Sequence, residues 1–326
     1  MNLILNPFHE PAFNLALEEY LLTRTRLELI MLWRNSKAVI IGSNQNAAQE
    51  IDADYVRERG IAVVRRQSGG GAVFHDLGNI NFTIIHAAAD GSFGGYAAFT
   101  APVCDYLKTL GVDAQFGGRN DLVIDGQKFC GNAQAMKCGR IMHHGCILFD
   151  ADFADLAGAL KPSAGKMESK GVKSVRSRVT NVSAHLKEPM SAQQFLEGLA
   201  DYFRANVAGL REYALTSGDI SAARALADEK YSSWDWNFGK SPPYNWGNAK
   251  RYSFGGVDVR LSVKAGVIES AAFSGDFFGV LDRSGLEDAL RGVRHEKSAL
   301  RGALGGVDIA GYIQGMTLEE LLELLC

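Results

Sequence analysis

The stretch RRQSGGGAVFHDLGN, residues 65–79, decides more about this protein than any other part of its 326 residues. Three consecutive glycines, Gly69 to Gly71, follow a strand-like run and expose backbone N–H groups that no side chain covers. Arg66 stands just before them and adds a positive charge. The stretch therefore predicts a cradle for an anion such as a phosphate, and a flexible hairpin turn is the competing interpretation.

The glycines fit neither of the common nucleotide-binding motifs. The sequence has no G-x-x-x-x-G-K-[ST] spacing and no G-x-G-x-x-G fingerprint between a strand and a helix. We therefore expect a nucleotide to be bound in another way.

Length and composition limit the class of protein. At roughly 150 residues per domain the chain has room for about two domains. Its 47% hydrophobic and 22% charged residues are ordinary for a globular protein. The 34 Lys and Arg residues against 37 Asp and Glu give a net charge of −3, so we expect no nucleic-acid partner.

Cysteines and apolar runs narrow the class further. The five cysteines form no C-x-x-C pair, which predicts reduced thiols and no structural zinc site. No apolar run approaches the roughly 18 residues that a membrane span needs, and the N-terminus lacks the pattern of a secretory signal. We expect a cytoplasmic protein with no membrane association.

Periodicity outside the glycine stretch predicts helices and strands without strict alternation, which favours an α+β fold. Helices are predicted from Pro11 to Leu21, over 98–110, and from Asp152 and Ser191, the last with a capping box of Ser191 and Gln194. Strands are predicted over 29–33, 38–41, 61–64, 80–85, 121–124 and 140–149.

A second unit is predicted after the polar, proline-containing stretch Ser241-Pro242-Pro243, which is typical of a linker. Strand patterns over 250–254, 257–263 and 267–273 follow, and Thr317 and Glu320 cap a last helix. We therefore expect a large domain over 1–245 and a small α+β domain over 246–326.

Another candidate cluster surrounds Lys128. The pair Asp125-Gly126 predicts a hairpin, so Lys128 would begin the returning strand on the same face as Cys130. An amine beside Gly131 has room for a substrate carboxylate, whereas a lone lysine is more often a solvated surface charge. The adjacent His143 and His144 point to opposite faces of a strand, so we assign no metal ligands to them.

Five motifs in order carry a family resemblance: RRQSGGGAVFHDLGN, GRNDLV, KFCGNAQ, HHG and KSVRSRVTN. They resemble the lipoate-protein ligase family, and in particular bacterial lipoate-protein ligases of type A. The resemblance covers nearly the whole chain, from the first helix through the SWDWNFG segment (residues 233–239) to an accessory C-terminal domain.

The resemblance implies a large mixed-sheet catalytic domain of the biotin/lipoate-protein ligase type and a two-step reaction. Lipoate and ATP with Mg²⁺ would give lipoyl adenylate and pyrophosphate, and the lipoyl group would then pass to a lysine of an apo lipoyl domain. The implied acceptors are the E2 subunits of 2-oxoacid dehydrogenases and the glycine-cleavage H protein.

The resemblance also implies site residues. Lys128 matches the family lysine that contacts the lipoyl carbonyl and the adenylate phosphate. The predicted ATP and lipoyl-adenylate site comprises Arg66, Ser68, Gly69, Gly70, Gly71, Ala72, Val73, Phe74, His75, Asn79, Asn120, Asp121, Lys128, Gly131 and His144. Asp121 would either orient Lys128 or hold Mg²⁺. Apolar residues of the first sheet and helix would enclose the lipoyl tail.

The basic segment from Lys161 to Arg178 has two interpretations. It carries six basic residues against Glu168 alone. In the ligase interpretation the segment folds over the adenylate and excludes water, and in the alternative it is a solvated charged loop.

Two other functions stay open at this point. An ATP-independent octanoyl or lipoyl transferase would use Cys130 or Cys146 as a nucleophile, and a non-catalytic lipoate-binding module would need neither step. The sequence does not decide between lipoate and octanoate, name the preferred acceptor or give the oligomeric state.

Overall fold

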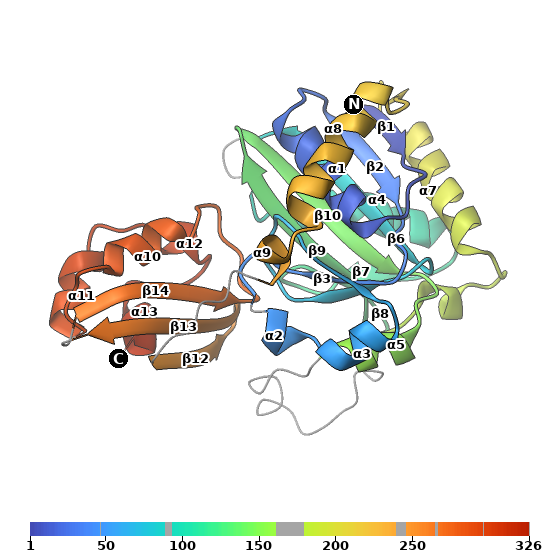
Figure 1. The fold of residues 1–326 in the computed structure, drawn as a ribbon. Helices are drawn as coiled ribbons and strands as arrows, with labels where there is room; N and C mark the ends of the chain where they lie inside the picture. The colour runs from blue at the N-terminus through green and yellow to red at the C-terminus, as the bar shows by residue number, and fades with distance from the viewer. Residues whose placement is uncertain are drawn as a thin grey trace.

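The computed structural model describes residues 1–45, 47–88, 93–160, 179–238, 246–264, 267–295 and 297–325. The predicted linker at Ser241–Pro243 and the basic segment from Lys161 to Arg178 lie outside these ranges. The described chain forms a large unit up to residue 238 and a small unit from Trp246 onward, which lie side by side (Figure 1).

A mixed sheet is the centre of the large unit. Its strands are β1 (Asn2–Leu5), β2 (Leu29–Trp33), β6 (Asn79–Ala87), β7 (Ala114–Phe116), β8 (Asp121–Ile124), β9 (Gln127–Lys137), β10 (Arg140–Leu148) and β11 (Arg211–Glu212). They run in the order β11-β1-β2-β6-β10-β9-β8-β7. β1 is parallel to β11 and β2, and the remaining pairs are antiparallel.

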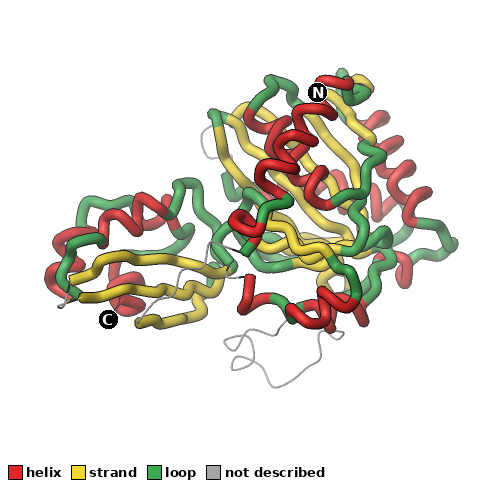
Figure 2. The backbone as a smooth tube through the Cα atoms, in the orientation of Figure 1, coloured by secondary structure: helices red, strands yellow, loops and turns green. Residues whose placement is uncertain are grey.

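Helices cover both faces of this sheet (Figure 2). On one face lie α1 (Pro11–Thr23) and α8 (Ser217–Leu226), which pack with β2 into one buried apolar cluster. On the other face lie α4 (Tyr96–Thr109) and α7 (Ala192–Asn206), which enclose a second cluster. Because both faces are buried, almost all side chains of the middle strands are either apolar or hydrogen-bonded.

A smaller sheet packs beside the large one and carries the glycine-rich stretch. It consists of β4 (Ala62–Arg65), β3 (Ala38–Ile41) and β5 (Val73–His75), in that order. The glycines connect β4 to β5, and both of these strands pair with β3. The short helices beside this sheet are α2 (Ala47–Glu50), α3 (Ala53–Glu58) and α5 (Phe153–Ala159).

The large unit ends in short helical elements. A 3-10 turn covers Val182–His185, α8 continues into a π-helical turn over Ala227–Tyr231, and α9 covers Trp234–Asn237. The last two elements return to the glycine-rich stretch, because Asn237 accepts a 2.8 Å hydrogen bond from the backbone N–H of Arg65.

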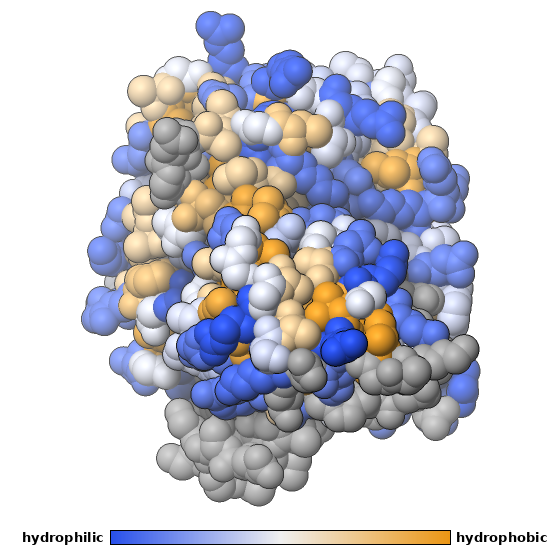
Figure 3. Space-filling model, turned by 90° about the vertical axis from the view of Figure 1, so that its left-hand side faces the viewer, coloured by the Kyte–Doolittle hydropathy of each residue, from blue (hydrophilic) through white to orange (hydrophobic). Residues whose placement is uncertain are grey.

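The small unit has its own sheet and its own apolar core. Its elements are β12 (Trp246–Tyr252), β13 (Gly255–Lys264), β14 (Val267–Gly275), α10 (Ser284–Leu290), α11 (Lys297–Leu304), α12 (Ile309–Tyr312) and α13 (Leu318–Leu325). Figure 3 turns this side toward the viewer, and there hydrophobic residues form small areas separated by hydrophilic ones. Among the described residues of this unit, Val280 and Leu281 are large apolar side chains exposed at the surface.

The predicted α+β class with a large mixed sheet is confirmed. The strands predicted over 29–33, 38–41 and 121–124 have the same bounds in the structure. The capping box of Ser191 and Gln194 is also present. The strand predicted over 250–254 is wrong in position, because β12 begins at Trp246 and Phe254 lies in the turn before β13.

None of the helices in the described part of the chain combines the length and hydrophobicity of a membrane span.

Candidate functional site

One face of the large sheet brings together the residues that the sequence singles out. Paired strands place five residues in one register row across β8, β9, β10, β6 and β2, namely Asp121, Gly131, Cys146, Asn81 and Trp33. His144 and Thr83 lie two positions along their strands and therefore point to the same side. The helix α1 and the glycine-rich stretch cover this face.

Lys128 reaches this face because of an irregularity between β8 and β9. The register shifts between Leu122 and Val123, which places Lys128 opposite Val123. A Cβ added to Gly131 would lie 2.9 Å from Lys128 Nζ, so the glycine leaves room for the amine. The prediction that Lys128 shares a face with Cys130 is wrong, because the bulge turns the lysine away while Cys130 stays in the core under α4.

Asp121 is the charged neighbour of Lys128. Lys128 Nζ lies 2.7 Å from Asp121 Oδ1, and both side chains are about a third exposed. The backbone carbonyl of Lys128 accepts a 2.9 Å hydrogen bond from the N–H of Thr180, just after the undescribed basic segment. Lys128 is therefore a cation at this end of the row that solvent, and hence a substrate, can reach.

Arg66 lies behind the glycines rather than in front of them. Its Nη2 donates to the carbonyl oxygens of Gly69 and Gly71 at 2.6 and 2.9 Å, and its Nη1 donates to Ile40 at 3.1 Å. Burial lowers the pKa of Arg66 to about 10, which leaves the guanidinium charged at neutral pH. The loop carbonyls turn toward this charge, so the loop curves around a buried cation.

Ser68 connects the loop to the sheet. Its Oγ accepts a 3.0 Å hydrogen bond from Arg66 Nε and lies 2.7 Å from His144 Nε2. His144 Nδ1 lies 2.9 Å from the Glu18 carboxylate, which also accepts a 2.6 Å bond from Thr83. This buried chain of polar groups fixes the orientation of His144 from both ring nitrogens.

Glu18 is a residue of this site that was not predicted from the sequence. Its neighbours Leu15 and Leu22, at helical spacing, mark a buried side of α1, and a carboxylate on such a side needs a partner. That spacing was the available signal. The partner, His144, lies far away in the chain and could not be read from it.

His75 and Asn81 have buried polar atoms that are free to meet a ligand. Within the described residues, His75 Nε2 and both atoms of the Asn81 amide have no hydrogen-bond partner. Burial, with the nearby Arg66, lowers the pKa of His75 to about 3, so its ring is neutral. Buried polar atoms are normally hydrogen-bonded, so these groups point to a bound molecule on this face.

Other predicted residues contribute mainly to the shape of the site. The Phe74 side chain packs in the core beneath the small sheet, so it offers only its backbone, while Ala72 and Val73 stay half-buried. Asn79 accepts from the N–H of Asp76 at 3.0 Å and closes the turn between β5 and β6. Asn120 donates a 2.6 Å bond to the carbonyl of Asn132 and fixes the edge of β9.

The two cysteines near the site are not activated as nucleophiles. Burial raises the pKa of Cys146 to about 12 and raises that of Cys130 well above its usual range. Cys130 is fully buried on the α4 side of the sheet. A thiol nucleophile needs a lowered pKa and access to its substrate, and neither cysteine has both.

The small unit touches the glycine-rich loop, which the sequence did not predict. The N–H of Gly70 donates a 3.2 Å bond to the carbonyl of Phe277. The ring of Phe278 lies under the guanidinium of Arg119, 5.0 Å from its centre, and 5.8 Å from the ring of Tyr96. One loop of the small unit therefore covers the predicted anion cradle.

The described residues hold no group of three His, Cys, Asp or Glu side chains that could bind a metal ion without a substrate. Asp121 is the carboxylate that pairs with Lys128.

Two family models match the chain. The lipoyl protein ligase A/B catalytic domain matches residues 10–204, and the bacterial lipoate protein ligase C-terminus matches residues 241–325. The chain is 44% identical over 321 residues to lipoate-protein ligase LplJ of Bacillus subtilis, with 97% of each chain covered. It is 37% identical over 322 residues to lipoate-protein ligase 1 of Staphylococcus aureus, with 98% of each covered.

Solved structures share the fold of this chain. The crystal structure of P. falciparum LipL1 in complex with lipoate has a TM-score of 0.77 at 23% identity, covering 99% of this chain and 96% of that one. A lipoate-protein ligase A bound with ATP has a TM-score of 0.65 at 30% identity, covering 73% and 99%. The ligase from an archaeal system with its E2 lipoyl domain, from Thermoplasma acidophilum, has a TM-score of 0.65 at 32% identity, covering 75% and 98%.

Proposed function

The chain belongs to the lipoate-protein ligase family, and we propose that the sheet face around Lys128 carries out both steps of its reaction. The protein is an ATP-dependent ligase that activates lipoate as lipoyl adenylate, releases pyrophosphate and transfers the lipoyl group to a lysine of a lipoyl domain. Lipoate and ATP are its substrates.

The observation that carries the site assignment is the position of Lys128. Its amine lies beside Gly131, in the register row that ends at Trp33. In the first step the lipoate carboxylate approaches the α-phosphate of ATP, and two anions repel each other unless positive charge offsets the repulsion. Lys128 is the accessible cation on this face, and Arg66 adds a second charge from behind the loop.

The bonding changes follow from this position. A carboxylate oxygen of lipoate attacks the α-phosphorus, the bond to the β-phosphate oxygen breaks, and pyrophosphate leaves with its electron pair. In the second step the neutral amine of the acceptor lysine attacks the carbonyl carbon of the adenylate. AMP leaves, the amine loses a proton, and an amide remains. Lys128 stabilises the charge on the carbonyl oxygen and the phosphate in both steps.

We place the lipoyl tail between this sheet face and α1. The unpartnered amide of Asn81 and the Trp33 ring lie on that face, and the ring of His75, from β5 of the small sheet, lies 6.2 Å from the Trp33 ring. Such tails bind in mostly apolar tunnels with a few polar groups, which fits this lining.

Magnesium would enter with ATP. A bound Mg²⁺ takes one or two protein carboxylates and completes its octahedral ligand set with phosphates and water. Asp121 would supply that carboxylate after releasing Lys128 to the substrate.

Residues 1–245 would form the catalytic domain and residues 246–326 the accessory domain. The acceptor would be a lipoyl domain of a 2-oxoacid dehydrogenase E2 subunit or the glycine-cleavage H protein. Its lysine would approach from the open end of the row, where Lys128 is exposed.

Exchange of labelled pyrophosphate into ATP tests the first step. The ligase should catalyse this exchange only when lipoate is present, because the exchange requires a reversible adenylate. Exchange without lipoate, or transfer without ATP, would exclude the proposed chemistry.

A further inference from the structure

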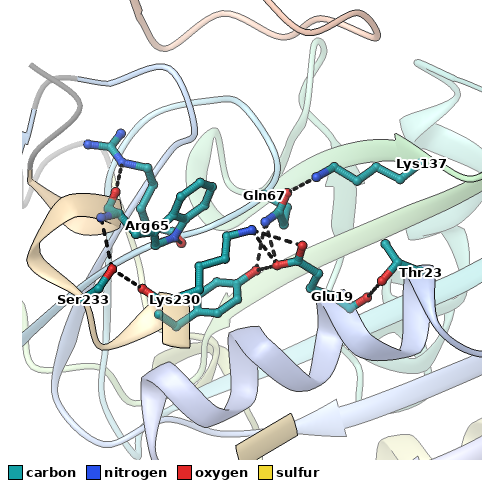
Figure 4. Close-up of polar contacts among 9 residues, drawn as sticks. Glu19, Thr23, Arg65, Gln67, Lys137, Lys230 and Ser233 are labelled. Carbon is teal, nitrogen blue, oxygen red and sulfur yellow. Dashed lines mark hydrogen bonds and ion pairs between the residues drawn. The ribbon is translucent and has the colours of Figure 1, made fainter. Parts of the chain in front are cut away.

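A cluster of polar side chains surrounds Gln67, at the entry to the glycine-rich loop (Figure 4). It joins Glu19 on α1, Gln67 after β4, Lys137 at the end of β9, and Lys230 and Tyr231 in the π-helical turn. The side-chain hydrogen bonds described for these residues do not reach the register row. The cluster therefore needs its own explanation.

Gln67 is held at both ends of its side-chain amide. Its Nε2 donates to Glu19 Oε2 at 2.8 Å and to the Tyr231 hydroxyl at 3.1 Å, and its Oε1 accepts from Lys137 Nζ. Gln67 is only half-buried, so a glutamine there would otherwise be free to move in solvent. These three hydrogen bonds fix Gln67, which immediately precedes Ser68 and the glycines.

Glu19 is the centre of the cluster. Besides Gln67, its carboxylate accepts 2.8 and 3.0 Å bonds from Lys230 Nζ and a 2.6 Å bond from the Tyr231 hydroxyl. These donors keep the pKa of Glu19 below its usual value in spite of burial, so it is ionised at neutral pH. Hydrogen bonds to an ionised group are roughly twice as strong as neutral ones.

Arg65, two residues before Gln67, anchors the same stretch through a separate set of partners. Its fully buried guanidinium donates to the carbonyl oxygens of Gly42 and Gln45 and to those of Trp236 and Asn237. The side chains of Arg65 and Gln67 are therefore held by separate partners just before the chain enters three glycines. A glycine-rich loop loses much conformational entropy when it becomes ordered, so a fixed entry lowers the cost of ordering it around a ligand.

We propose that Glu19 is a positioning residue for the nucleotide: through Gln67 it fixes the entry to the glycine-rich loop and thereby sets the affinity for ATP. This inference rests on the proposed function, because it takes the loop to be the ATP phosphate site. Glu19 does not touch the nucleotide. Its effect should therefore appear in the KM for ATP and not in the KM for lipoate, because the Glu19 carboxylate acts on the loop through Gln67.

A charge exchange tests the proposal. Glu19→Gln and Gln67→Glu each break the pairing of one carboxylate with one amide, and each should raise the KM for ATP about tenfold, the size expected from losing a hydrogen bond to a charged group. The double variant restores one carboxylate and one amide in exchanged positions. It should return the KM for ATP to within about threefold of the native value.

The matched control is Glu10→Gln. Glu10 is the residue immediately before α1 and pairs with Arg224 of α8, but this exposed pair does not reach Gln67. The control should leave both KM values unchanged. Thermal unfolding of all variants separates a loss of stability from a change in the loop.

The outcomes are distinct. If Glu19→Gln lowers the melting temperature but leaves the KM for ATP unchanged, or if the exchange does not rescue, the inference is overturned. If Lys128→Ala has full exchange activity, the proposed active site itself is wrong. If Lys128→Ala loses activity but Glu19→Gln has an unchanged KM for ATP, the proposed active site stands and only the inference about Glu19 is overturned.

Discussion

The N–H of Gly70 donates its hydrogen bond to the carbonyl oxygen of Phe277, so the C-terminal unit occupies one of the donors of the predicted anion cradle. A phosphate bound to that N–H and the carbonyl of Phe277 would compete for the same donor. This contact gives a structural reason to expect that the C-terminal unit changes position between adenylation and transfer.

Two alanine substitutions in the loop test this expectation. A Cβ at Gly69 would lie 2.5 Å from the Phe277 carbonyl oxygen, whereas a Cβ at Gly71 would find its nearest neighbour, Asp276, at 3.6 Å. Gly69→Ala should therefore shift the C-terminal unit away, and Gly71→Ala should not. Small-angle scattering of both variants, with and without lipoyl adenylate, checks this. Identical scattering in all four samples would contradict the expected movement.

Lys128→Ala should slow both half-reactions. Removing one preorganised donor to developing charge typically costs about 10² to 10³ in rate. Lys108→Ala is a suitable control, because Lys108 forms an exposed ion pair with Asp105 on α4, on the other face of the sheet. Pyrophosphate exchange measures the first step, and transfer from preformed lipoyl adenylate measures the second. Native rates in both assays would contradict the assignment of Lys128 as the catalytic cation.

Replacing the cysteines should have little effect. Cys146→Ser and Cys130→Ser should each lose less than about tenfold, or about 1.4 kcal/mol in barrier, because neither thiol has to form a covalent intermediate. The raised pKa of Cys146, about 12, is consistent with this. Intact-protein mass measurement after incubation with acyl donors should find no thioester. An acyl-enzyme that forms without ATP would instead support the transferase.

Transfer to the acceptor should weaken as salt rises. The acceptor lysine has to approach an adenylate beside Lys128 and Arg66, and the sequence between Lys161 and Arg178 adds further positive charge. An acceptor with an acidic surface would be attracted by these charges, and salt screens such attraction between exposed groups. Transfer rates at subsaturating acceptor, measured over a range of ionic strength, provide the test. Indifference to salt would remove the electrostatic part of the proposal.

Stability should fall as the pH drops below about 6.5. Burial lowers the pKa of His75 and of His143 to about 3, so both stay neutral in the folded protein while the unfolded chain takes up protons. The unfolded state then binds more protons, and each histidine costs at most about 1.4 kcal/mol per pH unit between 6.5 and 3.

His143→Phe isolates one of these contributions. The new ring can keep the stacking of His143 on Phe99, at 4.8 Å between ring centres, but cannot be protonated. The slope of unfolding free energy against pH, from denaturant titrations between pH 5 and 6.5, should fall by about one proton. An unchanged slope would mean that His143 is protonated in the folded protein.

Local elements were largely predictable from the sequence. The pair Asp125-Gly126 has positive φ angles of 50° and 75°, as its hairpin signal requires. The oxygen of Thr317 accepts from the N–H of Glu320, and the Glu320 carboxylate accepts from the N–H of Thr317, as the capping pattern predicts. These features depend on neighbouring residues alone, so their signal is contained in a few positions.

The side of a strand on which a side chain lies, and its contacts with residues distant in the chain, were less predictable from the sequence. Alternation placed Lys128 with Cys130, but a bulge opposite Leu122 and Val123 separated them. Nothing near Glu19 in the sequence indicates Gln67 or Tyr231, which reach it only after α1, β4 and the π-helical turn have packed together.

The sequence by itself determined the family motifs, the glycine-rich stretch, the strands and caps, and the identity of Lys128 as the candidate cation. Only the tertiary structure decided that Asp121, Gly131 and Cys146 share one row with Trp33, that His144 meets Glu18, and that Phe277 meets Gly70. Periodicity fixes backbone conformation and the buried side of each element over a few residues. The register and contact of strands distant in the chain depend instead on the summed packing of both apolar clusters, which no local pattern contains.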